Sequence, residues 1–165
     1  MAFALRKVSL DFLDAAPKRW RFAVQMSASQ EAVFAAISAD PSTWGWFPGM
    51  TGGAYDGPSP HGVGSTREVR QGPSVYRETI LAWDAPTRWV YRVDEMTVPL
   101  AHALVEEWAI EPAAAGSIVR WTLAIDPRRL FVAVLPVAPR GMERIFRRAM
   151  RNLDAILTGS ENRRA

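Results

Sequence analysis

Cysteine is absent from the 165 residues of this chain, and histidine is rare. The absence of cysteine excludes disulfide bonds, thiolate zinc sites and cysteine nucleophiles. The two histidines, His61 and His102, lie far apart, and neither has a second histidine or a carboxylate at metal-ligand spacing. A phosphate-binding glycine loop and the G-x-S-x-G motif are also missing. We therefore expect no metal site and no cofactor.

Long apolar runs are lacking as well. The longest, residues 130–139, is about half as long as a membrane-spanning helix and is interrupted by proline. No secretory signal peptide is recognisable, because Arg6 and Lys7 interrupt the apolar start of the chain. These features predict a cytoplasmic protein without stable membrane insertion.

Basic residues are in small excess, since the chain has 20 Lys and Arg residues and 17 Asp and Glu residues, for a net charge of +3. The densest basic group belongs to residues 140–164. Such a run on a helix usually faces solvent, and no aromatic residues alternate with these arginines to stack on bases. We therefore do not expect nucleic acid as a partner.

Hydrophobic residues are abundant, at 48% of the chain, and include 7 Trp and 7 Phe. This composition suffices for one substantial core. We expect a single domain over residues 1–165, with residues 1–18 as an N-terminal extension packed on its body and residues 159–165 as a flexible tail. A homodimer is compatible with the sequence, which does not decide the oligomeric state.

The order of the hydrophobic periodicities predicts an α+β fold. A strand over residues 20–26 leads into a helix over residues 30–38, which Ser27 and Gln30 begin with capping-box spacing. A second short helix starts at Asp40-Pro41. About six strand-like segments follow, and the clearest are residues 64–71, 75–83, 88–95, 100–111 and 117–126.

The last element is an amphipathic helix over residues 140–158, with one apolar stripe that includes Ile145, Phe146, Met150 and Leu153. A long helix that follows an antiparallel sheet has to pack across that sheet. If the sheet curls around the helix, a pocket remains between them, and we expect function to reside there.

Short motifs in this order are similar to those of a known superfamily. They are Val33-Phe34, Asp40-Pro41, the Trp-Gly-Trp-Phe-Pro-Gly run at residues 44–49, and residues 62–67, 76–80, 89–93 and 107–112. The chain resembles the START-like, or SRPBCC, superfamily, in its polyketide cyclase/dehydrase and lipid-transport-like branch. The resemblance implies a helix-grip (START/Bet v 1-like) fold: a curved antiparallel sheet of about seven strands around a long C-terminal helix, with two short helices after the first strand.

The alternation of side chains along a strand predicts which of them face the pocket. In residues 100–111, His102 and Glu106 share the parity of the apolar Leu104 and Trp108 and should point inward with them. A β-bulge would exchange inside for outside beyond it.

Two other strands carry polar candidates. In residues 64–71, the parity of Val69 brings Arg67 inward. In residues 75–83, apolar side chains occur on both faces, so the face that carries Tyr76 and Glu78 stays open between inside and outside.

We consider a polar cluster inside an aromatic pocket, formed by Arg67, Tyr76, Glu78, His102 and Glu106. Buried charges of this kind should be paired or should meet a polar ligand. His102, Glu106 and Glu78 are the candidate acids or bases, and a histidine near a carboxylate suits proton transfer near neutral pH. The alternative is that His102 and Glu106 lie at the sheet edge, solvated by water.

The expected partner is a hydrophobic or amphipathic small molecule, such as a lipid, an isoprenoid or a polyketide. A polyketide cyclase or dehydratase with an acid/base in the same cavity is the first alternative, and an interaction or stress-response module without ligand is the second. Residues 130–139 and 57–62 are candidates for the mouth. The predicted ligand-binding residues are Trp46, Phe47, Arg67, Tyr76, Trp89, Tyr91, His102, Leu104, Trp108, Trp121, Phe146 and Met150.

Overall fold

The structure, a computed structural model, describes residues 2–132 and 136–161. The helical elements are α1 (Phe12–Ala15), α2 (Gln30–Ile37), the 3-10 helix η1 (Pro41–Thr43), α3 (Arg129–Val132) and α4 (Ala138–Glu161). The strands are β1 (Phe3–Ala4), β2 (Lys18–Met26), β3 (Met50–Tyr55), β4 (Thr66–Gln71), β5 (Ser74–Asp84), β6 (Arg88–Met96), β7 (Ala101–Pro112) and β8 (Ser117–Pro127).

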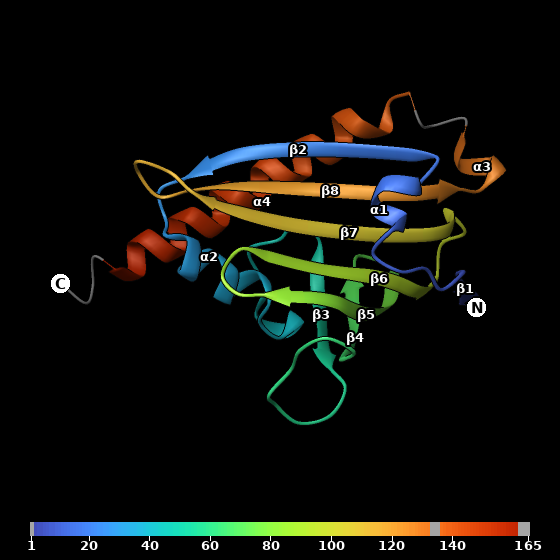
Figure 1. Cartoon of the computed structure of the whole chain (residues 1–165), viewed down its shortest axis with the longest axis horizontal. Coiled ribbons are helices and arrows are strands. Elements are labelled where there is room, and N and C mark those ends of the chain that lie inside the picture. Colours follow the sequence, from blue (N-terminus) through green and yellow to red (C-terminus); the bar gives the residue numbers. More distant parts are fainter. Residues whose placement is uncertain (1, 133–135, 162–165) are drawn as a thin grey trace.

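One antiparallel sheet forms the body of the molecule. Its strand order is β2-β8-β7-β6-β5-β4-β3, and β1 pairs with β6 off this path. In Figure 1 the sheet curves, and α4 runs along its far side behind β2, β8 and β7. The predicted helix-grip arrangement is therefore confirmed, with two short helical elements, α2 and η1, after β2.

The helix starts are those that the sequence indicates, with small differences. Ser29 caps α2 by accepting a hydrogen bond from the Ala32 amide, 3.2 Å away, so the cap lies two residues beyond the expected Ser27. Asp40 caps the next element through the Ser42 amide, with Pro41 at the first position. That element is a single 3-10 turn, which ends at Thr43.

The concave face of the sheet carries the main core. Along β8, Val119, Trp121, Leu123 and Ile125 are all buried on this face. Arg120, between the first two, points to the other face and pairs with Glu111. The period of two that the sequence shows along β8 is thus what builds this wall.

The convex face of the sheet carries a smaller core under the N-terminal segment. Phe12 and Leu13 of α1 are buried against Val90 of β6, Val105 of β7 and Ala124 of β8. The β1–β6 pairing attaches the segment before α1 to the same sheet. This face is filled by small and β-branched side chains and positions no part of the cavity described below.

The second half of α4 is fixed by polar contacts at the start of the fold. The Asp154 carboxylate accepts hydrogen bonds from the Ser27 and Ala28 amides, each at 2.9 Å. The Asn152 amide donates to the carbonyl oxygen of Trp46 at 3.0 Å. These bonds hold α4 to the junction of β2 and α2 and to the loop after η1, while its first turns lie over the cavity. No helix in the described ranges is long and apolar enough to cross a membrane.

Two strands contain irregularities that parity alone misses. The pairing of β7 with β8 shifts register between Ala101 and Ala103. The pairing of β5 with β6 shifts between Ile80 and Ala82, so that Ile80 is buried in the inner core and Ala82 in the outer one. Both strands therefore carry apolar residues on both faces.

Candidate ligand-binding cavity

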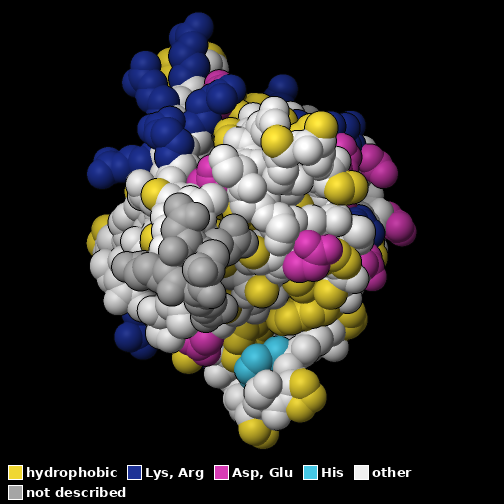
Figure 2. Space-filling model, turned by 90° about the vertical axis from the view of Figure 1, so that its left-hand side faces the viewer, with side chains coloured by type: hydrophobic (Ala, Val, Ile, Leu, Met, Phe, Trp, Pro, Cys, Tyr) yellow, Lys and Arg dark blue, Asp and Glu magenta, His cyan; other side chains and the backbone are white. Residues whose placement is uncertain are grey.

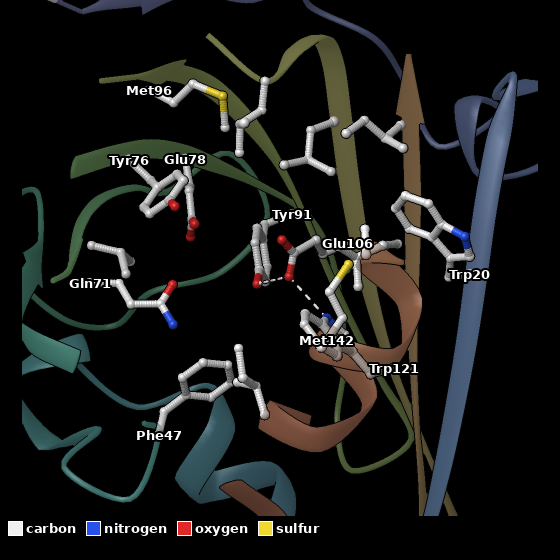
Figure 3. A pocket seen from close by; sticks show the side chains of 18 of the residues that line it. Trp20, Phe47, Gln71, Tyr76, Glu78, Tyr91, Met96, Glu106, Trp121 and Met142 are labelled. Atoms are coloured by element: carbon white, nitrogen blue, oxygen red, sulfur yellow. Dashed lines mark hydrogen bonds between the residues drawn. The ribbon is translucent and has the colours of Figure 1, made fainter. Parts of the chain in front are cut away.

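A cavity of about 440 Å³ lies between the concave face of the sheet and the segment α3–α4 (Figure 3). The sheet and the loops before β3 and β7 supply most of its wall: Trp20, Trp44, Phe47, Met50, Val69, Gln71, Tyr76, Glu78, Tyr91, Met96, Leu100, Leu104, Glu106, Trp121, Leu123 and Ile125. The helical side supplies Phe131, Ala138, Gly141, Met142 and Ile145.

The cavity borders solvent on its helical side. Ile145 lines the cavity and is 40% exposed, so this side chain borders both the interior and solvent. Phe131 and Ala138, from the expected mouth at residues 130–139, also line it, whereas residues 133–135 lie outside the described residues. The other expected mouth, residues 57–62, contributes no lining residue; His61 there stacks on Tyr55 at 4.2 Å between ring centroids.

Glu106 is the polar centre of the cavity wall. Its Oε2 accepts a hydrogen bond from the Tyr91 hydroxyl at 2.5 Å and another from the Trp121 indole N–H at 2.9 Å, as Figure 3 shows. Its other oxygen, Oε1, has no hydrogen-bond partner among the described residues. Burial raises the pKa of Glu106 to about 7; the two hydrogen bonds oppose this shift and the neighbouring Glu78 charge adds to it.

A buried ion pair lies behind the same wall. Arg67 is 1% exposed, and its Nε and Nη2 atoms both lie 2.7 Å from Glu78 Oε2. The guanidinium carbon lies 4.7 Å from the Trp44 ring, 4.5 Å from the Trp89 ring and 4.8 Å from the Tyr91 ring. Burial opposes the charge of Arg67, but Glu78 and the surrounding groups outweigh it and raise its pKa.

Two further polar side chains reach the cavity from β4 and β5. The Gln71 amide N–H donates to the Pro48 carbonyl oxygen at 3.1 Å, which leaves its oxygen free. Tyr76 lines the same wall, and burial raises the pKa of its hydroxyl, so that it stays protonated. In Figure 3, Gln71, Tyr76, Glu78 and Glu106 all point into one space.

The residues predicted for the site fall into three groups. Those that line the cavity are Phe47, Tyr76, Glu78, Tyr91, Leu104, Glu106 and Trp121. Those that are buried in the core or behind the wall without lining the cavity are Trp46, Arg67, Trp89, Trp108, Phe146 and Met150. The sequence left open which face of β5 points inward, and the structure places the face with Tyr76 and Glu78 toward the cavity.

His102 forms the third group, and its predicted position is wrong. The side chain is exposed and contributes nothing to the cavity wall, although it lies two residues before Leu104. The physical reason is the irregularity between Ala101 and Ala103, which turns His102 to the outside while Ala101 and Leu104 stay in the inner core. No acid/base role in the cavity follows for this histidine.

Several lining residues escaped the sequence analysis. Trp20 lies on a strand whose inner parity is readable, and Met96 ends another. Met142 and Ile145 belong to the apolar stripe of α4, so the stripe was the available signal. No sequence signal marked Gln71 as a lining residue, because a glutamine at the end of a strand resembles a turn residue. Over the described residues, no group of three or more His, Asp or Glu side chains is arranged to hold a metal ion.

Comparison with known proteins identifies the family. The chain matches the family described as polyketide cyclase / dehydrase and lipid transport over residues 19–158. The match covers far more than half of the chain, so the chain belongs to this family, and the resemblance to the START-like superfamily is confirmed.

Individual proteins are similar to this chain in sequence or in fold. An uncharacterized protein of Mycobacterium tuberculosis is 28% identical over 165 residues, which cover 96% of this chain and 98% of that protein. The ginseng (Panax ginseng) major latex-like protein 151 superposes with a TM-score of 0.72 at 12% identity, over 85% of this chain and 97% of that one. A Nitrosomonas europaea protein gives a TM-score of 0.68 at 11% identity, over 87% and 96%. At these identities the two structures show a shared fold alone.

Proposed function

We propose that this member of the polyketide cyclase/dehydrase and lipid transport family binds a hydrophobic or amphipathic small molecule between its sheet and α4. The observation that carries the proposal is the cavity of about 440 Å³, whose wall is mostly aromatic and aliphatic with a few converging polar groups. Cavities that bind small molecules typically span about 300–1,000 Å³ and have this composition.

The affinity would come mainly from the apolar part of the wall. Each square ångström of apolar ligand surface removed from water contributes about 25 cal/mol. Leu104, Leu123 and Ile125 offer aliphatic surface, and Phe47 and Trp121 offer ring faces. Glu106, Gln71 and Tyr76 are the polar groups that can orient the bound molecule.

The route of entry would run past the first turns of α4. Met142 and Ile145 stand at this side, and Ile145 is partly in solvent. Phe131 and Ala138 line the cavity from the same helical side.

A second candidate function is acid–base catalysis in the same cavity, and Glu106 favours it. Its pKa of about 7 lets it both take and give a proton near neutrality, and its Oε1 is free to reach a bound molecule. The candidate acid or base is thus Glu106. If the protein is a cyclase or dehydratase, Glu106→Gln abolishes turnover and leaves binding of the apolar part of the substrate intact.

The test of binding uses two variants of one strand. Leu104→Trp adds volume inside the cavity, whereas His102→Trp places the same side chain on the exposed face of β7. We expect the neutral fluorophore N-phenyl-1-naphthylamine to bind the wild type and His102→Trp, and to bind Leu104→Trp at least about tenfold more weakly. Absence of binding to all three folded proteins would overturn the proposal and favour an interaction module without ligand.

A further inference from the structure

The cavity wall presents carboxylate and amide oxygens that are free to accept hydrogen bonds from a ligand. Glu106 uses only Oε2, and Glu78 likewise uses only Oε2, for Arg67. The Gln71 amide donates one of its two N–H groups to the Pro48 carbonyl oxygen, and its Oε1 accepts no hydrogen bond from the described residues. Three oxygens, Oε1 of each of these side chains, therefore have no hydrogen-bond partner among the described residues. The donors on this wall carry no charge: they include the second N–H of Gln71, the Tyr76 hydroxyl and the Trp44 indole N–H, which has no partner among the described residues.

Positive charge is kept off the same wall. Among the described residues that line the cavity, none is Lys, Arg or His. Arg67 is close, but it is 1% exposed and enclosed by Glu78 and the rings of Trp44 and Trp89. The other basic side chains gather elsewhere, and Figure 2 shows a group of them at the upper left of the face that it draws.

The charged and titratable groups that face Glu106 come from three strands, β4, β5 and β6. Tyr91 on β6 donates to it, and Tyr76 and Glu78 on β5 and Arg67 on β4 act on it through space. β8 and α4 face the cavity around it with Trp121, Leu123, Met142 and Ile145, which carry no charge. A ligand that ionises Glu106 would therefore need to supply the positive charge itself.

We propose that the cavity selects amphiphiles whose polar end is a protonated amine, and that it discriminates against carboxylates and alcohols of the same chain length. The inference rests on the proposed function and names its ligand class. An ammonium group has three donors and no acceptor, which matches three free acceptor oxygens. A carboxylate brings only acceptors and a second negative charge beside Glu106.

The aromatic wall supports the same choice. Trp44, Phe47, Tyr91 and Trp121 line the cavity, and the faces of such rings attract cations. The protein already uses this interaction once, since Arg67 lies among the rings of Trp44, Trp89 and Tyr91. A second cation on the open side of Trp44 and Tyr91 would find the same kind of surface, together with Glu106.

The test compares three ligands that differ only in their polar end: decylamine, decanol and decanoic acid. Their dissociation constants are measured at pH 8 by displacement of N-phenyl-1-naphthylamine. We expect decylamine to bind at least about tenfold more tightly than the other two. Between pH 6 and pH 8 the ionised fraction of Glu106 rises about tenfold, and the amine stays protonated, so its affinity should rise by about tenfold.

Two variants identify the residue responsible. Glu106→Gln keeps the shape of the side chain but cannot ionise, so decylamine binding should lose both its advantage and its pH dependence. Glu107→Gln makes the same change one residue along β7, on the opposite face, where the side chain pairs with Arg88, and should leave both unchanged.

The outcomes separate this inference from the proposed function. Equal or tighter binding of decanol or decanoic acid at pH 8, or an amine affinity that stays constant from pH 6 to 8, would overturn the amine selectivity and leave the binding function standing. If neither the fluorophore nor any of the three ligands binds, the binding function itself fails. The wild-type measurements decide the matter even if Glu106→Gln does not fold.

Discussion

The space between the sheet and α4 contains two unlike regions. The first region, which we call the packed cluster, is filled by buried side chains: Trp46, Trp89, Trp108, Phe146 and Met150. In the cavity, smaller or more widely spaced side chains such as Leu104, Leu123 and Met142 leave about 440 Å³ empty. The two regions share the same strands and the same helix. They differ in the size of their side chains and in their distance from the hydrogen bonds that hold α4.

One core thus supports both stability and binding. The packed cluster lies where Asp154 and Asn152 hold α4 to the start of the fold. Two rings of the cluster pack against rings of the cavity wall. The ring centroids of Trp108 and Trp121 are 5.5 Å apart, and those of Trp89 and Tyr91 are 4.8 Å apart. The cluster therefore also supports the back of the cavity wall. We therefore expect substitutions in the packed cluster to cost stability, and substitutions in the cavity to change binding.

Trp108→Ala should have the largest effect on stability. The side chain is fully buried between Trp121 and Phe146, and its removal should lower the free energy of unfolding by about 4 kcal/mol in urea denaturation. Trp108→Phe is the control, because it keeps a ring and removes an indole N–H that has no hydrogen-bond partner in the described part of the chain, and it should cost less than half as much. A similar cost for both variants would contradict this reading.

Glu78→Gln should come next, at about 3 kcal/mol, because it leaves the buried charge of Arg67 uncompensated. The double variant Arg67→Met, Glu78→Leu removes both charges and should recover most of the loss. If the double variant is as unstable as Glu78→Gln, the uncompensated charge of Arg67 does not explain the loss of stability. Chemical denaturation of the three proteins at one pH decides this.

Two leucine substitutions compare the regions directly. Leu153→Ala on α4 opens a hole in packed surroundings and should cost about 3 kcal/mol. Leu104→Ala borders space that is already empty, so fewer contacts are lost, and it should cost about 1 kcal/mol. Equal costs in urea denaturation would mean that the cavity is not open in solution.

Glu106 should make stability depend on pH in a defined direction. Its pKa is raised to about 7 in the folded chain, above the usual value of 4.5, so the folded state binds the proton more tightly than the unfolded state. The stabilising contribution is complete below pH 4.5 and is lost as the pH rises through 7, at about 1 kcal/mol per pH unit.

The variant Glu106→Gln removes this dependence. The difference in unfolding free energy between variant and wild type should therefore shift in favour of the variant from pH 5 to pH 8. A difference that is constant over this range would show that the carboxyl is not buried as described.

His102→Ala should have the smallest effect, within about 0.5 kcal/mol in stability and without change in ligand affinity, because its side chain is exposed outside the cavity. Loss of affinity for N-phenyl-1-naphthylamine in this variant would contradict the position of the β7 irregularity.

The sequence predicted the architecture well because the signals for it are repeated. The alternation along residues 117–126 and the apolar stripe of α4 each repeat over several residues, so an error at one position does not matter. The same rule placed Tyr91, Glu106 and Trp121 on the inner face, and all of them line the cavity.

The site was predicted only in part, because it depends on single positions. One irregularity before Ala103 moved His102 to the outside. Parity also gives only the face of a residue, and it does not show whether that face is filled. Trp89 and Trp108 point inward as expected, yet they are packed against other rings and do not reach the cavity.

The most direct test of the binding site is native mass spectrometry of the folded protein after incubation with N-phenyl-1-naphthylamine, the neutral probe whose binding does not depend on the amine selectivity. Our account predicts one bound molecule per chain for the wild type and for His102→Trp, and the bare mass for Leu104→Trp. A wild type that stays at its bare mass, or a Leu104→Trp variant that binds as much ligand as the wild type, would contradict binding in the cavity between the sheet and α4.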